Sequence, residues 1–471
     1  MKAARPNPRT LFDKVWDAHV IESLGDGWAL LHVDRHLLHD LSGSRGLAEL
    51  DRRELPVRNP ELTMALPDHA VSSAPGRTGQ TFPGGEQMWR RLRDGSGKHA
   101  IRIYDIGDPF HGIVHVTGPE QGFVLPGSVV VCGDSHTCTN GALGALAFGI
   151  GSSELMHVLA TQTLAQRKPR TMRIRFEGEL EHASAKDLIL ATIGRLGAAA
   201  GTGHAVEYCG PVIDRMSVEQ RLTVCNLSIE MGAKFGMIAP DATTFAYLAG
   251  RPFAPRGELF ERAVAHWKTL GSDEGAHFDR EVTIDASGVV PMITWGTSPE
   301  HVMAIGGRVP EDDDVPDAAR RQEWRSAREY MGLDRGAQLL GQRVDRVFIG
   351  SCTNSRLSDL VAAAGQLRGH RRVAAHVEAW VVPGSEQVKR DAEALGLHEQ
   401  FKAAGIQWRE PGCSMCVAAN GETARPGQRV VSTSNRNFVG RQGPGVRTHL
   451  ASPETAVACA LAGAIVDPRE L

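Results

Sequence analysis

The sequence has 471 residues, of which 42% are hydrophobic and 23% are charged, and its 52 Lys and Arg against 55 Asp and Glu give a formal net charge of −3. At about 150 residues per domain, this length predicts roughly three domains, each able to bury a core without disulfide bonds. The near-neutral balance excludes a bulk cationic field for nucleic acid or an anionic membrane. We therefore expect the partners of the chain to be decided by individual sites.

The sequence predicts neither a secretory signal nor a membrane-crossing segment. The first ten residues are polar and interrupted by proline, and the longest apolar stretch, 142–150, is short and broken by glycines. We therefore expect a cytoplasmic protein. In that compartment its eight cysteines are reduced, which favours metal binding or catalysis over disulfide bonds for any that cluster.

Strand-like and helix-like patterns alternate along the chain and predict an α/β fold. The β-branched run 128–132 predicts a strand, which is followed by polar and glycine-rich loops and then by a helix from Ser152 that ends near Pro169. Apolar residues that alternate with arginine at 172–176 predict a half-buried strand, and the apolar spacing of 188–196 predicts a helix.

Later in the chain, further buried strands are predicted to run directly into polar loops. These strands are 347–349, 379–382 and 430–431. Ligands of α/β folds gather at the carboxyl ends of strands, so we expect the chemistry there. Composition places the domain borders near 170 and 290, which predicts domains 1–170, 171–290 and 291–471.

Three cysteines form the most informative pattern: Cys352 in GSCTNSR, with Cys413 and Cys416 in PGCSMC. Four thiolates complete the coordination of a structural zinc or an electron-transfer cluster, whereas three leave one position open. An open iron is a Lewis acid that can polarise a substrate hydroxyl and make it a feasible leaving group. The pattern favours a cluster, but the spacing alone leaves zinc, a redox CxxC pair, buried structural cysteines and a fourth cysteine ligand as alternatives.

A second pattern joins histidine with carboxylate. Its members are Asp68, His69, His115, Asp134, His136 and Glu230. A carboxylate that holds one imidazole nitrogen fixes the tautomer and raises basicity, which suits general acid catalysis on a leaving hydroxyl. A single histidine is more often a surface or core residue, but residues 134–136 directly follow a predicted strand. Asn226 lies one helical turn before Glu230, so the two can share a face.

The third pattern is the loop 432–441, STSNRNFVGR, which is dense in amide and hydroxyl donors. Arg436 and Arg441 in this loop fit bidentate recognition of a dicarboxylate, and the alternative is an arginine-rich surface loop. The glycine-rich run 141–151 lacks a dinucleotide-binding fingerprint, so we interpret it as tight packing near a site.

Together these patterns resemble the aconitase superfamily, and the resemblance covers nearly the whole chain. The further motifs that carry it are LFDKVWDAHV, DRHLLHD, GIVHVTGPEQG, VCGDSHT, GALGALAFGIG, LATQTL, GTGHAVEYCG, IEMGAK, REYMGL and RTHLASP. The resemblance implies an aconitase-like three-domain α/β/α core around an iron-sulfur cluster. It also implies one 4Fe-4S cluster held by Cys352, Cys413 and Cys416, with one iron left open.

The resemblance also implies a role for each residue that matches a family motif. The implied catalytic residues form three pairs: Asp68 with His69, His115 with Asp134, and His136 with Glu230. The residues implied to lie near substrate or cluster, or to hold carboxylate groups, are Ser135, Asn226, Asn435, Arg436 and Arg441.

The motifs are most similar to those of superfamily members that act on 2-alkylmalates. In these enzymes a hydroxyl leaves with acid assistance, a cis-alkene forms, and water returns at the neighbouring carbon. We therefore expect isomerisation of 2-isopropylmalate to 3-isopropylmalate through 2-isopropylmaleate, a step of leucine biosynthesis. We find no counterpart of the C-terminal swivel domain of single-chain aconitases, so we expect a separate small subunit to complete a heterodimer and the isolated chain to be almost inactive.

Some positions depart from the pattern of the isopropylmalate enzymes, namely Ala70, Asn140 and the stretch 71–85. These departures leave citramalate, dimethylmalate and homocitrate as alternative substrates. Outside this class of enzyme, the alternatives are a clusterless RNA-binding or regulatory protein and a zinc-structured scaffold. We expect no nucleic-acid or membrane partner, because the chain has no basic bias and retains the acid and arginine residues.

Overall fold

Parallel β-sheets organise the computed structural model, which describes residues 7–314, 317–369 and 371–471. The first sheet, ordered β5-β4-β3-β6-β7, contains β3 (Arg35–His39), β4 (Thr63–Leu66), β5 (Arg102–Ile103), β6 (Val129–Cys132) and β7 (Leu146–Gly149). The second, ordered β11-β10-β9-β12, contains β9 (Arg170–Glu177), β10 (His204–Cys209), β11 (Phe235–Ile238) and β12 (Arg280–Asp285). The third, ordered β17-β16-β15-β18-β19, contains β15 (Arg346–Ile349), β16 (Glu378–Val381), β17 (Gln407–Trp408), β18 (Arg429–Ser432) and β19 (Arg447–Leu450).

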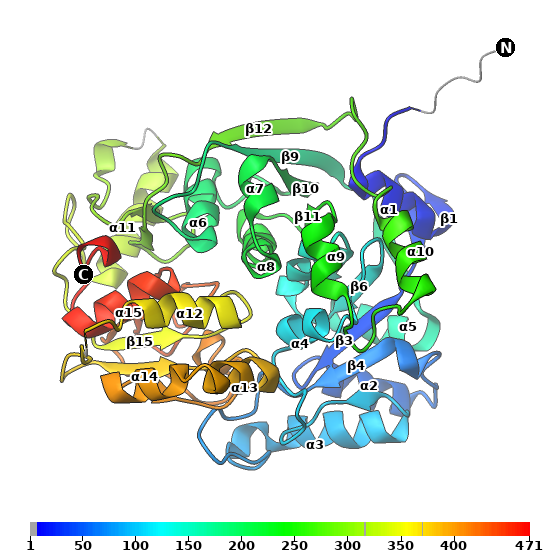
Figure 1. Cartoon of the computed structure of the whole chain (residues 1–471), viewed down its shortest axis with the longest axis horizontal. Coiled ribbons are helices and arrows are strands. Elements are labelled where there is room, and N and C mark those ends of the chain that lie inside the picture. The colour runs from blue at the N-terminus through cyan, green and yellow to red at the C-terminus, as the bar shows by residue number, and fades with distance from the viewer. Residues whose placement is uncertain (1–6, 315–316, 370) are drawn as a thin grey trace.

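Helices and two small antiparallel sheets complete the described part of the chain (Figure 1). The antiparallel sheets consist of β1 (Val20–Gly25), β2 (Trp28–His32) and β8 (Thr163–Arg167), and of β13 (Met292–Thr294) and β14 (Val302–Ala304). The α-helices are α1 (Leu11–His19), α2 (Gly43–Arg52), α3 (Pro83–Lys98), α4 (Val114–Glu120), α5 (Ser152–Thr161), α6 (Ala185–Leu196), α7 (Pro211–Arg215), α8 (Val218–Asn226), α9 (Ala242–Leu248), α10 (Glu258–Trp267), α11 (Ala318–Met331), α12 (Leu357–Gly365), α13 (Glu386–Ala394), α14 (Leu397–Ala404) and α15 (Pro453–Ala462).

The central strands of the first and third parallel sheets are short buried runs because both faces of these sheets are covered, whereas β9 of the second sheet is half-buried and β12 is largely exposed. Every residue of β6, VVVC, is buried, and so is every residue of β15, RVFI. One continuous apolar core joins the first two parallel sheets, and a separate core lies around the third. The third sheet therefore forms a distinct packing unit that meets the other two across polar loops.

The α/β class expected from the sequence is confirmed, as are the strands expected at 128–132, 172–176 and 347–349. The helix expected from Ser152 to near Pro169 is wrong at its end, because α5 stops at Thr161. The next residues form β8, which pairs with β2 along its whole length. Strand pairing therefore overrides the local pattern there. The domain borders near 170 and 290 stay predictions.

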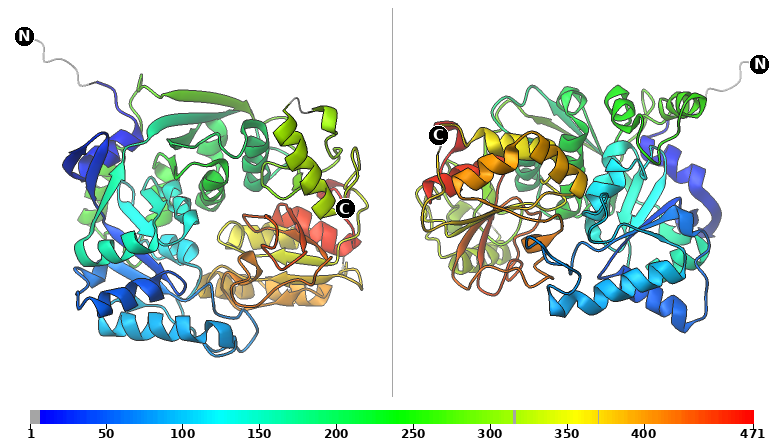
Figure 2. Two further views of the ribbon diagram at one scale, coloured as in Figure 1. Left: turned by 180° about the vertical axis from the view of Figure 1, so that it is seen from behind. Right: turned by 60° about the horizontal axis from the view of Figure 1, so that its bottom comes forward.

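Loops at the carboxyl ends of the first and third parallel sheets face each other. Strands β3, β4 and β6 lead into the loops that carry 40, 68–69 and 134–136, while β15, β17 and β18 lead into those that carry 352, 413–416 and 433–436. The backbone N–H of Cys413 donates to the carbonyl of Asp68 at 2.8 Å, and that of Ile113 donates to Gly384 at 2.8 Å. Figure 2 shows the two units meeting from two further directions. The expected gathering of polar loops is therefore built by two sheets rather than one.

A segment between two strands of the second sheet also reaches this meeting point. Helix α8 runs into a 3₁₀ turn, Leu227–Met231, and the two carry Asn226 and Glu230. Of the helices in the described ranges, none combines the length and the apolar character needed to cross a bilayer.

Candidate active site

Three buried thiols mark the centre of the candidate site. Cys352, Cys413 and Cys416 are each at most 5% exposed. Burial raises the pKa of the Cys352 and Cys413 thiols above the ordinary value, so both stay protonated at neutral pH unless a cation compensates the thiolate charge. Buried thiols with this property are suited to hold a metal centre.

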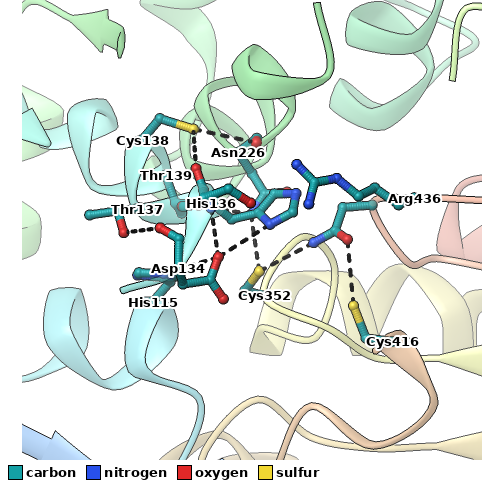
Figure 3. Close-up of polar contacts among 12 residues, drawn as sticks. His115, Asp134, His136, Thr137, Cys138, Thr139, Asn226, Cys352, Cys416 and Arg436 are labelled. Atoms are coloured by element: carbon teal, nitrogen blue, oxygen red, sulfur yellow. Dashed lines mark hydrogen bonds and ion pairs between the residues drawn. The ribbon is translucent and has the colours of Figure 1, made fainter. Parts of the chain in front are cut away.

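Amide and hydroxyl groups point at these sulfurs. The side-chain N–H groups of Asn226 and Asn435 donate to Cys352 Sγ at 3.1 and 3.5 Å, and Ser434 Oγ donates to Cys416 Sγ at 3.2 Å. Figure 3 shows Asn226 above Cys352 and Cys416 below it. Such donors stabilise thiolate charge, which is the second-layer support that metal-bound sulfur requires.

The loops that present the cysteines adopt uncommon backbone conformations. Ser351, directly before Cys352, has φ 78°, and Ser414, directly after Cys413, has φ 50°. Left-handed backbone at a residue other than glycine costs on the order of 1 kcal/mol and persists where the surroundings impose it. The strain is therefore stored in the two loops that would hold a bound group.

His69 lies between two carboxylates. Its Nδ1 contacts Asp68, and its Nε2 lies 3.1 Å from Asp134 Oδ2. Burial by itself lowers the pKa of His69, but the negative charge of Asp68 and the hydrogen bonds with Asp134 and Asp68 outweigh it and hold the pKa well above the ordinary value. His69 is therefore a cationic imidazole at neutral pH, poised to donate a proton.

His136 forms the other close pair. Its Nε2 lies 2.9 Å from Glu230 Oε1, and Arg436 Nε donates to the same oxygen at 2.7 Å. Burial by itself raises the pKa of Glu230, but the hydrogen bond with His136 and the charges of His136 and Arg436 hold it below the ordinary value. Glu230 is therefore an ionised link between the histidine and the arginine loop.

His115 sits further from its expected partner. The nearest approach between His115 Nε2 and Asp134 Oδ1 is 3.9 Å, which is longer than a hydrogen bond. Its Nδ1 is instead met by the side-chain amide of Asn140 at 3.2 Å, and burial lowers the pKa of His115 to about 4. His115 is therefore neutral at neutral pH, and Asp134 makes its shorter contacts with His69 and His136.

A cavity of about 370 Å³ opens onto these groups. The polar residues that line it and matter for binding are Arg45, His69, Ser135, His136, Arg436 and Arg441. Arg441 Nε is buried and has no hydrogen-bond partner among the described residues, so the guanidinium is available to a ligand. Three arginines around a small cavity are the arrangement expected for a ligand with more than one carboxylate.

Several supporting residues were not singled out from the sequence. Asp40 is fully buried and accepts the backbone N–H groups of His69 and Ala70 at 3.0 and 2.7 Å, which fixes the loop behind His69. The motif DRHLLHD contains it, and its place at the carboxyl end of a strand was the available signal.

Lys186 carried no such signal. A lysine near the start of a helix is usually exposed to solvent. Lys186 is instead fully buried, and it donates to the carbonyls of Thr433 and Ser434 at 3.0 and 2.7 Å. Burial lowers the pKa of Lys186 to about 8. It ties α6 to the loop that carries Asn435.

Glu422 ties the loop between the cysteines to the rest of the site. It accepts hydrogen bonds from Ser73 Oγ at 2.6 Å, Ser414 Oγ at 2.5 Å and Arg409 Nη2 at 2.8 Å. Burial by itself raises the pKa of Glu422, but these hydrogen bonds and the charge of Arg409 lower it to about 2. Ionised Glu422 therefore stabilises the folded protein.

Replacing Glu422 with glutamine is expected to lower the free energy of unfolding by about 2–4 kcal/mol at pH 7, because Arg409 is left buried without a charge partner. The folded-state pKa is depressed, so the stabilisation is fully present above the unfolded pKa of about 4.5 and lost as pH falls towards 2. Urea unfolding of the wild type and the variant from pH 7 to pH 3 measures this, with exposed Glu399→Gln as the control. A difference that stays constant with pH would contradict the assignment.

The fold and this site define an α/β protein in which three buried thiols face histidine–carboxylate pairs and a group of arginines. The model of the aconitase family (aconitate hydratase) matches residues 13–463, and the chain belongs to that family. The resemblance found in the motifs is thereby confirmed. Membership implies an iron-sulfur cluster, and the buried thiols with their amide donors fit such a group.

Two similar proteins cover nearly the whole chain. The 3-isopropylmalate dehydratase large subunit 1 of Bradyrhizobium diazoefficiens is 63% identical over 464 residues, which cover 98% of this chain and 97% of that protein. The 3-isopropylmalate dehydratase large subunit of Roseiflexus castenholzii is 52% identical over 469 residues, which cover 98% of this chain and 99% of that protein. Among solved structures, holo aconitase X of Thermococcus kodakaraensis is 12% identical with a TM-score of 0.49, covering 89% of this chain and 88% of that one.

Proposed function

We propose that the chain is the cluster-bearing large subunit of a 3-isopropylmalate dehydratase, which isomerises 2-isopropylmalate to 3-isopropylmalate through 2-isopropylmaleate in leucine biosynthesis. The observation that carries this proposal is a cavity lined by the cationic His69 and by Arg45, Arg436 and Arg441. The three-cysteine centre adjoins it, since Cys413 Sγ lies 3.8 Å from His69 Nδ1. The near-full-length identity to two large subunits of that name supports it.

Cys352, Cys413 and Cys416 are proposed to hold one 4Fe-4S cluster with one iron left open. Among the described residues, two groups place all their candidate ligand atoms within 4.8 Å of one another, and the three cysteines are not among these groups. Such a separation favours a cluster over one zinc ion, since a cluster spans more space than a single ion. The free state of all eight cysteines also supports a reducing compartment, and we place the protein in the cytoplasm.

The arginines are proposed to bind and orient the substrate. Arg436 and Arg441 come from the same loop, and Arg45 comes from the start of α2, so together they can hold two carboxylates from different sides of the cavity. Fixing both carboxylates places the hydroxyl of the substrate beside His69, whose Nδ1 lies 3.8 Å from Cys413 Sγ.

His69 is proposed to act as the general acid. Held as a cation between Asp68 and Asp134, it donates the Nε2 proton to the departing hydroxyl and takes a proton back when water returns at the neighbouring carbon. The cluster, when bound, supplies a Lewis acid that makes hydroxide a feasible leaving group. Two further pairs are proposed to keep the charges and hydrogen bonds around this proton transfer in place. They are His136 with Glu230 and His115 with Asp134.

A separate small subunit is proposed to supply the base that removes the C–H proton. Asp134 is the one carboxylate among the residues that line the cavity in the described chain, and it is engaged by His69 and the backbone N–H of His136. Both relatives are named large subunits, which supports a small-subunit partner.

The departures at Ala70 and Asn140 lie behind the cavity rather than in its wall. Both residues are at most 1% exposed, and neither is among the lining residues. They act on the site through their neighbours, since Asn140 contacts His115 and Ala70 contacts Asp40. Because neither residue lines the cavity, these two departures do not favour citramalate, dimethylmalate or homocitrate, and the names of the two relatives support isopropylmalate.

Arg441→Lys is expected to raise the KM for 2-isopropylmalate about tenfold, because lysine keeps the charge but loses the bidentate geometry. Steady-state kinetics of the two-subunit enzyme measures the change, and Arg425→Lys, at an exposed position, serves as the matched control. An unchanged KM would remove Arg441 from the carboxylate site.

The substrate is tested by reconstituting the chain anaerobically with its small subunit and comparing kcat/KM for isopropylmalate, citramalate, dimethylmalate and homocitrate. We expect isopropylmalate to be preferred by at least tenfold, and the chain alone to be almost inactive. A clear preference for another of these acids would overturn the proposed substrate.

A further inference from the structure

A second cavity lies at one edge of the second sheet. Its volume is about 510 Å³. It is bounded by the link between β8 and β9, by the start of β10 and by the start of β11. These are the amino-terminal ends of parallel strands, whereas the site loops of the first and third sheets follow the carboxyl-terminal ends of strands. None of the residues that line the catalytic cavity lines this one.

The wall of this second cavity is positively charged. Arg167, Lys168, Arg170 and Lys234 line it, and no aspartate or glutamate does. Lys168 is paired with Asp13 and Asp17, but in the described ranges neither Arg167 nor Arg170 makes a side-chain hydrogen bond or ion pair. Arg167 therefore has no carboxylate partner among the described residues, and Arg170 has only a through-space interaction with Asp279, beside a hollow in a chain whose overall formal charge is −3.

The floor of the cavity is formed by buried side chains. His204, Phe235 and Gln166 are at most 8% exposed. Lys234 Nζ donates to Gln166 Oε1 at 2.6 Å and lies 4.8 Å from the centroid of the Phe148 ring. An ammonium has three N–H donors, so Lys234 retains donors for a ligand.

Lys234 lacks a direct carboxylate partner at this site. Burial lowers the pKa of Lys234, and Glu154 offsets this effect through space. Lys234 reaches this carboxylate only through Gln166, whose side-chain amide donates to Glu154 at 3.0 Å. A bound anion would supply the missing counter-charge.

We propose that this cavity binds a small phosphate-bearing molecule. The unpaired Arg167 and Arg170 present planar forks that match phosphate oxygens, and Lys234 adds a point charge from the floor. A free amino acid or a polyamine fits poorly, because no lining carboxylate would receive its ammonium group. The volume falls in the range of small-molecule sites, about 300–1,000 Å³, and exceeds what a single phosphate fills.

Inorganic pyrophosphate is the probe, titrated calorimetrically into the cluster-loaded chain in complex with its small subunit. We expect saturable binding that weakens with added salt, as charge attraction does. The double variant Arg167→Gln/Arg170→Gln is expected to bind pyrophosphate at least tenfold more weakly, and Lys234→Gln to weaken it as well. Arg215→Gln, an exposed arginine paired with Glu179 away from this cavity, is the matched control and should bind as the wild type does.

Two further titrations separate this cavity from the catalytic one. Binding should persist in Arg441→Gln and in the presence of saturating 2-isopropylmalate, whether or not that acid is turned over. Wild-type affinity in the Arg167→Gln/Arg170→Gln variant would overturn the proposal. So would loss of binding in Arg441→Gln or competition by 2-isopropylmalate, because either result would place the pyrophosphate in the catalytic cavity.

Discussion

Replacing Cys352 with serine is expected to remove the iron-sulfur cluster and to lower dehydratase activity about a thousandfold or more. Serine cannot supply a thiolate, so only two of the three proposed cluster ligands remain in this variant. A Lewis acid contributes several kcal/mol to a reaction of this kind, and each 1.36 kcal/mol is worth a factor of ten in rate. The measurements are iron and acid-labile sulfide per chain, together with kcat on 2-isopropylmalate in the two-subunit enzyme.

Cys459→Ser is the matched control for this variant. Cys459 is fully buried in α15, within the same third unit, and contacts none of the candidate site residues through a hydrogen bond. We expect it to retain the cluster and most of the activity. Full cluster content and activity in Cys352→Ser would contradict the proposed ligand set.

Asp134→Asn is expected to lower kcat by a factor of about 10²–10⁴, the range for a lost acid–base partner. Asp134 holds His69 Nε2 at 3.1 Å and the backbone N–H of His136 at 2.6 Å. Hydrogen bonds from His136 and His69 hold the pKa of Asp134 well below its ordinary value against the effect of burial. An asparagine keeps the shape but removes this negative charge.

The pH profile separates a lost proton donor from a general disturbance. The raised pKa of His69 predicts activity that persists through neutral pH and falls as pH rises through that pKa. Loss of the Asp134 charge lowers the pKa of His69, so the alkaline limb of kcat should move to lower pH in Asp134→Asn. The control is Asp279→Asn, which replaces a carboxylate that accepts a hydrogen bond from the backbone N–H of Thr171 and should leave the pH profile unchanged. An alkaline limb that stays in place would contradict the role of His69.

The sequence predicted the strands that run into polar loops, because short β-branched runs such as 129–132 are legible without tertiary information. It also pointed to Asp68, His69 and Glu230, whose types and neighbours suit acid–base chemistry. The contacts among them could not be read from spacing. Asp134 was expected beside His115, but its short contact is with His69, because the loops after β4 and β6 lie next to the same strand, β3.

Supporting residues were the hardest to predict. The buried ammonium of Lys186 is explained only by carbonyl groups of a loop some 250 residues away, which no local pattern reveals. The network of Glu422 joins Ser73, after a strand of the first sheet, to Ser414, after a strand of the third, and local patterns do not reveal it either. The end of α5 at Thr161 was missed because pairing with β2 decides that the next residues form a strand. Long-range contacts, rather than propensity, determine all three.

Three cysteines are proposed to hold a cluster whose remaining iron meets the substrate. Mössbauer spectroscopy of the ⁵⁷Fe-loaded two-subunit enzyme, with and without 2-isopropylmalate, measures this contact. We expect one iron site of the cluster to change its spectrum on addition of substrate while the others do not. Zinc without inorganic sulfide in the purified protein, or a cluster whose iron sites are all unaffected by substrate, would contradict it.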